Sequence, residues 1–314
     1  MNGVLLLNKP AGPTSHDMVD FIRRLSDTRR VGHAGTLDPF ATGLLVLLIG
    51  QATRISQFLT NLDKKYLATI ALGESTDTLD RTGKVVETSA IPLPGRAEIE
   101  TVLQSFVGES EQIPPMYSAK KINGRPLYRA ARRGEEVNRE AKTVRVHSIE
   151  LIEVSKSTFT VRVCCSKGTY VRVLAEAIAR RLGGCGHLAD LQRESSGRFQ
   201  LHDAVTPEQA ETSARDGKFA ELLLPIGSAL ADLPAVTVAE QTAKGLRNGI
   251  RPPTFGLTAH DAFRRGQTVR MLDPESRLLA IARALLDAEQ LARQPGSAAP
   301  FELLSVFEPP SSDK

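Results

Sequence analysis

The sequence of 314 residues contains no tryptophan, and aromatic residues make up only 5% of it. A surface built from stacked aromatic platforms is therefore excluded, and any stacking on nucleic-acid bases must come from a few individual rings. Long apolar runs are also missing, since the longest, 4–7 and 44–49, fall far short of the roughly 20 residues of a membrane-spanning helix. No basic segment precedes the first apolar run, so we expect neither a signal peptide nor a membrane contact.

Cysteine is scarce as well. Cys164, Cys165 and Cys185 make an odd number and lack CxxC spacing. The first two are adjacent, and neighbours on a strand point to opposite faces, which makes them poor disulfide partners. We expect reduced core thiols in a cytoplasmic protein. We expect no metal site, because no second ligand cluster accompanies the thiols, and no cofactor, because GxGxxG and GK[ST] loops are absent.

What the sequence does have is a concentrated positive charge. The whole chain carries a net charge of +4, but residues 119–145 contain nine Lys or Arg and three Glu, a local charge of +6. The rest of the chain therefore sums to −2. Such a concentration indicates contact with a polyanion, although a solvated helix face would have the same composition. The position of the segment in the fold has to decide between the two interpretations.

Strand and helix patterns interleave along the chain. Alternating or continuous apolar patterns predict strands at 3–8, 44–49, 66–72, 85–88, 143–152 and 158–165. Helical spacing predicts helices at 15–25, capped by Ser15, and at 52–62, 97–106 and 170–182. We predict an α+β fold with a mixed, largely antiparallel sheet flanked by helices. Short strand patterns after residue 230 predict a small β-rich domain, so we expect domains at 1–230 and 231–314.

Residues 26–43 show neither the strand pattern nor the helical spacing of apolar residues, so we expect a loop. Loops of that length in a compact domain are usually functional. Asp38 lies in this loop, where Pro39 restricts it to extended backbone angles. Gly32 and Gly35 permit close approach of another chain. A lone loop aspartate is most often a turn or cap residue, however, so these features alone give Asp38 only a weak claim to catalysis.

The surrounding segment strengthens that claim. Residues 32–44, Gly-His-Ala-Gly-Thr-Leu-Asp-Pro-Phe-Ala-Thr-Gly-Leu, resemble the catalytic motif of the TruB family of tRNA pseudouridine synthases. Further segments resemble family motifs in the family's order: 7–15, 65–66 together with 72–80, 112–119, 167–172 and 186–197. Together they span residues 4 to about 199, and a chance coincidence of six ordered segments is implausible.

The resemblance implies an activity and a catalytic set. The family isomerises uridine to pseudouridine in the T arm of tRNA (position 55), breaking the C1′–N1 bond, turning the base and joining C1′ to C5. Asp38 matches the catalytic carboxylate, which either attacks the sugar or abstracts a proton toward a glycal intermediate. Arg172 matches the cation that keeps this carboxylate charged, and Tyr66 the ring that stacks on the target base.

The resemblance also implies how the RNA is bound. A base in a folded T loop must be flipped out before it can react. Tyr170 and Leu191 match residues that line the uracil pocket, and His33 matches a histidine that contacts RNA near the vacated position. Residues 119–145 fall where the family carries an RNA-clasping thumb. That position favours RNA contact over a solvated face and makes Lys120, Arg132 and Arg133 candidate RNA ligands.

Two points qualify the resemblance. The C-terminal segment is compatible with the PUA-like RNA-binding domain of the family but carries no specific motif. Gln192 stands where the family commonly has arginine, which puts local RNA positioning in doubt. The alternative function is a catalytically silent tRNA-binding or tRNA-folding protein on the same scaffold, against which the intact set of Asp38, Tyr66 and Arg172 speaks. We expect a monomer without an obligate protein partner.

Overall fold

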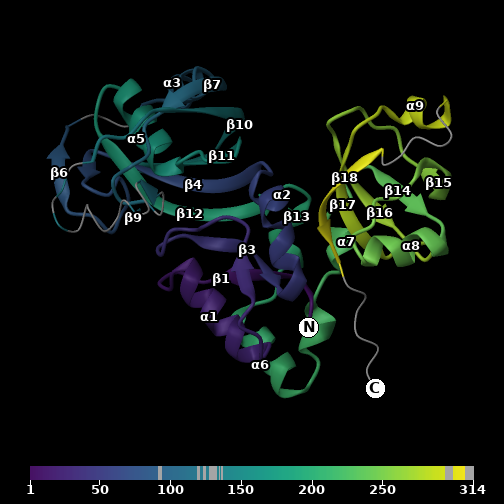
Figure 1. The fold of residues 1–314 in the computed structure, drawn as a ribbon. Coiled ribbons are helices and arrows are strands. Elements are labelled where there is room, and N and C mark those ends of the chain that lie inside the picture. The colour runs from purple at the N-terminus through teal and green to yellow at the C-terminus, as the bar shows by residue number, and fades with distance from the viewer. Residues whose placement is uncertain are drawn as a thin grey trace.

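The computed structural model of the chain describes residues 1–90, 94–118, 121–122, 125–126, 133, 135, 137–293 and 300–307. Within these residues nine strands form one sheet and five strands a second, smaller sheet (Figure 1). Seven strands of the large sheet lie in the order β1 (Gly3–Lys9), β3 (Thr42–Ile49), β12 (Gly186–Ser196), β4 (Lys64–Leu72), β11 (Thr158–Cys165), β10 (Lys142–Val154) and β7 (Gly108–Gln112). Of the pairings among them only β12 with β3 is parallel, so the predicted mixed, largely antiparallel sheet is confirmed.

Strands β1 and β3 are buried on both faces, which explains why their sequences are continuous apolar runs rather than alternating ones. Side chains such as Leu5 and Leu47 pack on one face against α1 (Ser15–Leu25) and α6 (Pro207–Arg215). Val4 and Leu48 pack on the other face, beneath η1 (Gly50–Ile55) and α2 (Ser56–Thr60).

Helix α1 begins differently from the sequence prediction. Thr14, not Ser15, is the N-cap, and it forms a capping box with Asp17. Ser15 is buried and bonds instead to Leu37 of the loop that follows β2 (Val31–His33). The predicted cap was therefore wrong by one residue, and the misplaced serine has a long-range partner.

The second half of the large sheet is covered on one face by α3 (Arg96–Gln104) and α5 (Val171–Arg181) (Figure 1). Apolar side chains from β4, β11 and α5, including Ile70, Phe159 and Ile178, form its core. Among the described strands, the two halves of the sheet are paired only through the short parallel ladder of residues 192–193 with 42–43. Here the backbone of β12 passes directly against the end of the loop that carries Asp38.

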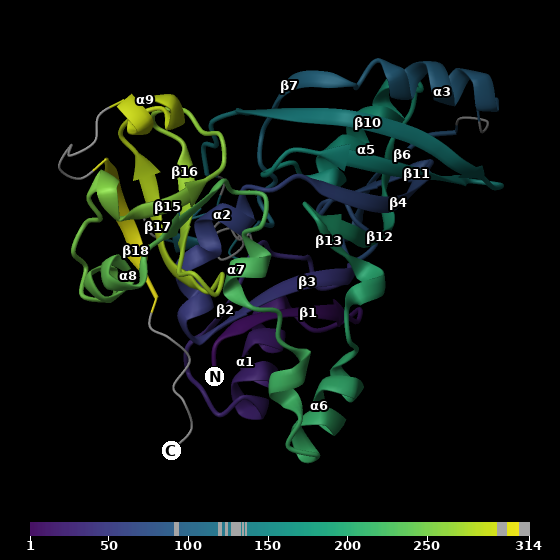
Figure 2. The same ribbon diagram turned by 90° about the vertical axis from the view of Figure 1, so that its right-hand side faces the viewer.

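The C-terminal part forms the second sheet, and the predicted β-rich domain is confirmed. Its strands lie in the order β15 (Leu257–His260), β14 (Ala235–Val238), β16 (Thr268–Leu272), β17 (Leu278–Ala284) and β18 (Phe301–Val306). Helices α8 (Glu240–Arg247) and α9 (Ala288–Arg293) accompany it, and α7 (Ile226–Ala229) lies between the two sheets (Figure 2). Ile281 and Phe307 pack into the core beside β1 and β3, which joins the two parts.

The remaining elements are short. They are β5 (Glu74–Thr76), β6 (Val85–Thr88), β8 (Lys121–Ile122), β9 (Arg125–Pro126), β13 (Phe199–Gln200), η2 (Leu201–Asp203), η3 (Phe219–Leu222) and η4 (Thr254–Gly256). All three cysteines are free, and burial raises the pKa of Cys165 to about 12. Across the described segments, no helix is long and apolar enough to cross a membrane.

Gly43 at the sheet junction gives a stability prediction. Its φ is +98°, and an added Cβ would lie 2.5 Å from the carbonyl oxygen of Arg193. Gly12 has a similar φ of +108° but nothing within 4 Å of an added Cβ. We expect Gly43→Ala to lower the free energy of unfolding by at least about 2 kcal/mol more than Gly12→Ala. Both variants strain the backbone, because both positions have a positive φ, but only the alanine at position 43 would also clash with Arg193. Urea denaturation measures this, and equal losses would contradict it.

Candidate active site

The loop between β2 and β3 is fixed by groups from β1 and α1. The Ser15 hydroxyl accepts a hydrogen bond from the Leu37 N–H at 2.8 Å and donates to the Leu37 carbonyl at 3.0 Å. The fully buried Lys9 donates through Nζ to the carbonyl of Pro39 at 3.2 Å. Burial lowers the pKa of Lys9 to about 8, against the opposing effect of Asp38. Asp38 is thus held from both sides by bonds to its neighbours Leu37 and Pro39.

Arg193 of β12 fixes the same loop from the opposite side. It is almost fully buried and donates to two loop carbonyls, those of Gly35 at 3.1 Å and Thr36 at 3.3 Å, and to the carbonyl of Leu44 in β3 at 2.6 Å. Within the described residues no carboxylate pairs with it. Its positive charge is therefore solvated by backbone dipoles and is not cancelled, which leaves it effective toward a bound anion.

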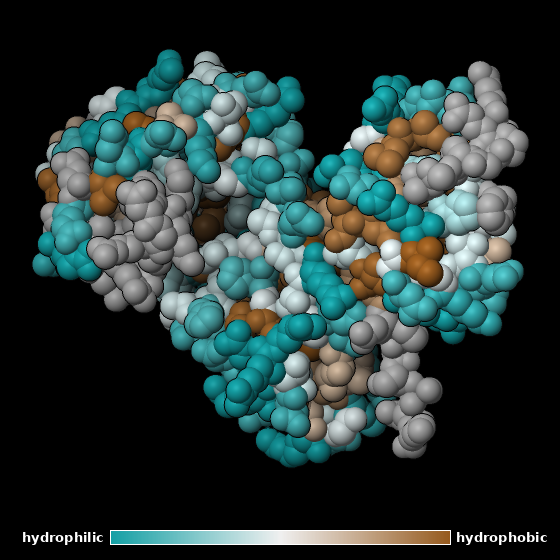
Figure 3. Space-filling model, in the orientation of Figure 1, coloured by the Kyte–Doolittle hydropathy of each residue, from teal (hydrophilic) through white to brown (hydrophobic). Residues whose placement is uncertain are grey.

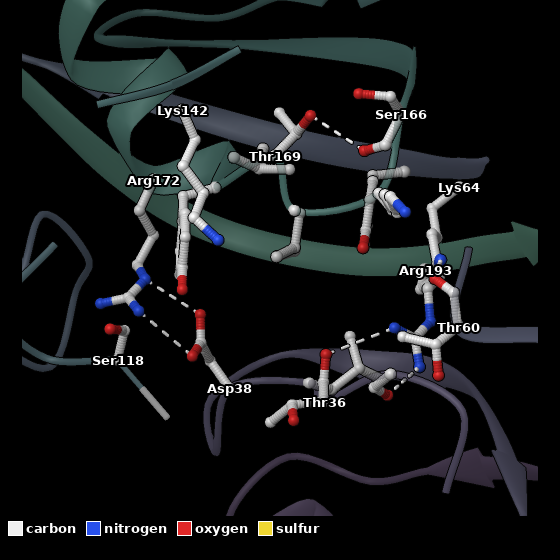
Figure 4. Close-up of a pocket in the computed structure, with 18 of the residues that line it drawn as sticks. Thr36, Asp38, Thr60, Lys64, Ser118, Lys142, Ser166, Thr169, Arg172 and Arg193 are labelled. Carbon is white, nitrogen blue, oxygen red and sulfur yellow. Dashed lines mark hydrogen bonds and ion pairs between the residues drawn. The ribbon is translucent and has the colours of Figure 1, made fainter. Parts of the chain in front are cut away.

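Arg172 at the start of α5 joins two carboxylates. Its Nε lies 2.9 Å from Oδ2 of Asp38, and its Nη2 donates to Oδ1 at 3.2 Å (Figure 4). On its other side Nη1 lies 3.2 Å from Oδ2 of Asp80. The guanidinium also donates to the carbonyls of Thr78 and Tyr117, both at 2.9 Å. A planar group with five donors can satisfy all four partners at once, which a lysine could not.

Asp80 is itself buried and saturated with donors. Its Oδ1 accepts from the Thr78 hydroxyl at 2.9 Å and from both the N–H and the hydroxyl of Thr82, at 2.9 Å and 2.5 Å. This carboxylate orients Arg172, since its own position is fixed by the turn around it. The pattern is a carboxylate–guanidinium–carboxylate row, with only one end accessible.

That accessible end is Asp38, whose side chain remains 33% exposed while that of Asp80 is 5% exposed. The surrounding protein raises the pKa of Asp38, chiefly through burial, and the Arg172 guanidinium lowers it. The nearby Asp80 charge raises it further. Ionised Asp38 therefore depends on Arg172, and the carboxylate faces a space that a substrate can enter.

The space is a pocket of about 540 Å³, which falls within the range of small-ligand sites. Its wall contains Asp38, Tyr66, Tyr170, Arg172 and Leu191, so five of the predicted site residues come together. Tyr66 lies on β4 and Leu191 on β12, and both are nearly buried. Burial also raises the pKa of Tyr66, against the lowering effect of Arg193. In Figure 3 the surface is hollowed between the lobe of α3 and α5 and the lobe of α1.

The other predicted residues are not among the described residues that line the pocket. His33 on β2 is half-buried and does not line this pocket, and burial and Arg193 lower its pKa. Arg133 is exposed and forms an ion pair with Glu135, with Nε 2.6 Å from Oε1. Lys120 and Arg132 lie outside the described residues.

The sequence prediction also missed several residues of the pocket. Among the described residues that line it, five carry positive charge and one carries negative charge: Lys64, Lys142, Lys167, Arg172 and Arg193 against Asp38. Ser118 and the rim residues Ser166 and Thr169 lie there too. Asp80 and Ser118 fall in motif segments that the prediction quoted without giving them a role. The described residues contain no cluster of His, Cys, Asp or Glu that could hold a metal ion.

Comparison with known proteins agrees with this geometry. Residues 23–171 match the model of the N-terminal domain of TruB family pseudouridylate synthases. The tRNA pseudouridine synthase B of Geobacillus thermodenitrificans is 46% identical to this chain in a region that covers 81% of this chain and 87% of the relative's length. That of Syntrophotalea carbinolica is 43% identical over 98% of both chains. A chain of a Cbf5–Nop10–Gar1 complex superimposes with a TM-score of 0.77 at 27% identity, covering 98% of this chain and 85% of that one.

The match to the family model and the names of the curated relatives define the class of protein, an enzyme that isomerises uridine to pseudouridine in RNA. Within that class, the identity to curated bacterial relatives over most of their length places the chain in the TruB family of pseudouridylate synthases. The resemblance found in the sequence motifs is confirmed.

Asp80 gives a second stability prediction. Asp80→Asn removes the charge that opposes the buried Arg172, so we expect the free energy of unfolding to fall by about 2–4 kcal/mol. Glu194→Gln is the control, because it breaks an ion pair with Arg162 of similar length, 2.8 Å, that is 39% and 23% exposed. We expect it to cost less than about 1 kcal/mol. Urea denaturation of both variants tests the difference, and similar losses would show that Asp80 is not holding a buried charge.

Proposed function

We propose that this protein converts a uridine in the T arm of tRNA, at position 55, to pseudouridine, with Asp38 as its catalytic carboxylate. The observation that carries the proposal is the Asp38–Arg172 ion pair at the wall of a cation-rich pocket. The names of the curated relatives, tRNA pseudouridine synthase B, support the tRNA substrate. We infer that uracil and its ribose enter the pocket after the nucleotide has flipped out of the T loop.

Asp38 acts as an ionised carboxylate at the sugar. Attack on C1′ and removal of a sugar proton toward a glycal both need the charged form, which Arg172 maintains against the effect of burial. In either route the C1′–N1 bond breaks, the uracil turns within the pocket, and C5 bonds to C1′. The proton that C5 loses passes to solvent, and N1 carries a proton in the product.

The remaining predicted residues hold the base and the RNA. Tyr66 stacks on the uracil, and Leu191 and Tyr170 form the walls that limit its rotation. Tyr170 is fixed for this purpose, since its N–H donates to Oε1 of Gln112 at 2.7 Å and its carbonyl accepts from Nε2 at 3.1 Å. His33 contacts RNA beside the pocket.

We propose that two regions outside the pocket bind the rest of the tRNA. Residues 119–145 act as the thumb, in which Lys120, Arg132 and Arg133 contact phosphates. Arg133 leaves its ion pair with Glu135 when it binds a phosphate of the RNA. The chain divides into a catalytic domain, 1–230, and a PUA-like domain, 231–314, that touches tRNA away from the target. The protein acts as a monomer in the cytoplasm, a compartment in which thiols such as its three cysteines remain reduced.

Substitution of Asp38 tests the function. With tRNA transcript labelled with tritium at uridine C5, we expect the wild-type protein to release tritium from the T-arm position. Asp38→Asn should lower this rate at least about 10³-fold while the Kd for tRNA changes by less than roughly threefold, because chemistry is lost and contacts are kept. Asp20→Asn on the exposed side of α1 is the control. Wild-type protein that binds tRNA without releasing tritium would instead support the catalytically silent alternative.

The rim cations give a prediction on binding. Lys142 and Lys167 are exposed at the pocket, at the start of β10 and just after β11. We expect the double change to glutamine to weaken tRNA binding and to reduce the slope of log K against log salt by about 1.4–1.8, two phosphate contacts. Lys156→Gln is the control, since it lies in the turn at the opposite end of the same hairpin. Binding titrations at several salt concentrations measure the slope, and an unchanged slope would exclude these phosphate contacts.

A further inference from the structure

Ser118 has a buried hydroxyl that nothing in the mechanism uses. The residue is only 4% exposed, and it lines the pocket that contains Asp38. Its Oγ has no hydrogen-bond partner among the described residues. A buried hydroxyl without a partner is destabilising, so its position at the wall of a substrate pocket indicates that a ligand atom completes it.

The position of this hydroxyl is fixed by the catalytic arginine. The neighbouring carbonyl of Tyr117 accepts from Nη2 of Arg172 at 2.9 Å, and the N–H of Ser118 donates to the Met116 carbonyl at 3.0 Å. Four residues before Ser118, the carbonyl of Pro114 accepts a hydrogen bond from Arg139 at 3.1 Å. The segment that carries Ser118 is therefore attached to the same guanidinium that holds Asp38.

Figure 4 shows which end of the pocket the hydroxyl serves. Ser118 and Arg172 lie on one side of Asp38, whereas Arg193 and Lys64 lie on the other. Tyr66 belongs to the second side, because it is paired across the strands with Arg193. A uracil stacked on Tyr66 therefore occupies the side of Arg193, and the sugar attached to it extends past Asp38 toward Ser118.

We propose that Ser118 is a specificity-determining residue that hydrogen-bonds the ribose 2′-hydroxyl of the target uridine. This rests on the proposed function, which places C1′ at Asp38. The 2′-hydroxyl is bonded to the carbon next to C1′, and it both donates and accepts hydrogen bonds, as a serine hydroxyl does. The ring oxygen O4′ can only accept, and the base polar atoms lie on the side of Tyr66. A contact to the 2′-hydroxyl distinguishes RNA from DNA at the reacting nucleotide.

A chemical double-mutant cycle tests the proposal. T-arm RNAs with either uridine or 2′-deoxyuridine at the target position are bound to Asp38→Asn protein, which leaves them unreacted, with and without Ser118→Ala. We expect either change alone to raise Kd about five- to tenfold, the effect of one hydrogen bond to a neutral group. We expect the two changes together to cost no more than one. Losses that multiply would overturn the assignment, and so would a 2′-deoxy RNA that binds the Ser118 protein as tightly as its ribose counterpart.

Measuring the rate of tritium release distinguishes a failure of the Ser118 assignment from a failure of the proposed function on which it rests. Wild-type protein that releases no tritium from T-arm RNA would defeat the proposed function, whatever Ser118 does. With turnover established, we expect Ser118→Ala to slow release from the ribose substrate at least about fivefold. Ser196→Ala is the matched control, because Ser196 is 1% exposed and its Oγ also lacks a partner, but it does not line the pocket. Equal effects of the two serines would show a structural role and overturn the proposal.

Discussion

The ion pair between Arg172 and Asp38 is the contact on which the rest of the site depends. A carboxylate surrounded by protein atoms would take up a proton unless a cation opposed it, and Arg172 supplies that cation. The arginine is in turn buried and would be costly without partners, so Asp80 and two carbonyls complete its coordination. A single guanidinium thereby connects the turn after β5, the segment before Ser118 and the loop between β2 and β3.

The pairing of strands in the large sheet determines where this ion pair lies in the fold. In the part of the chain that the structure describes, its two halves are paired only where β12 meets β3, and the loop of Asp38 ends at this junction. Gly43 permits the close approach, and Arg193 bonds the loop carbonyls from the other strand. The loop of Asp38 is therefore held at both ends, because it forms part of the seam between two cores. A loop attached at one end only could not hold Asp38 against Arg172.

The sequence predicted the elements that have a regular apolar pattern and missed those whose pattern is interrupted or replaced by polar residues. The apolar runs of β1 and β3 and the helical spacing of α1 and α5 predicted those elements. Strand β12 was missed because polar residues interrupt it, although Arg193 and Leu191 within it are buried. The edge strand β7 was missed because its sequence, Gly-Glu-Ser-Glu-Gln, is almost entirely polar.

The candidate site divides in the same way. The motif resemblance predicted Asp38, Tyr66, Arg172, Tyr170 and Leu191, which the fold brings to one pocket. Asp80 and Ser118 were not predicted, because their roles depend on partners 92 residues away in one case and on an unoccupied hydrogen bond in the other. Only a three-dimensional arrangement reveals such features.

Three buried cations of the site form no ion pair with a carboxylate among the described residues. Lys9, Lys64 and Arg193 are buried and donate to backbone carbonyls, so their charges are solvated without being neutralised. Burial lowers the pKa of both Lys9 and Lys64 to about 8, which shows how strongly the fold disfavours these charges on its own. Lys64 and Arg193 line the pocket, so its wall carries a positive charge that suits a polyanionic substrate such as RNA.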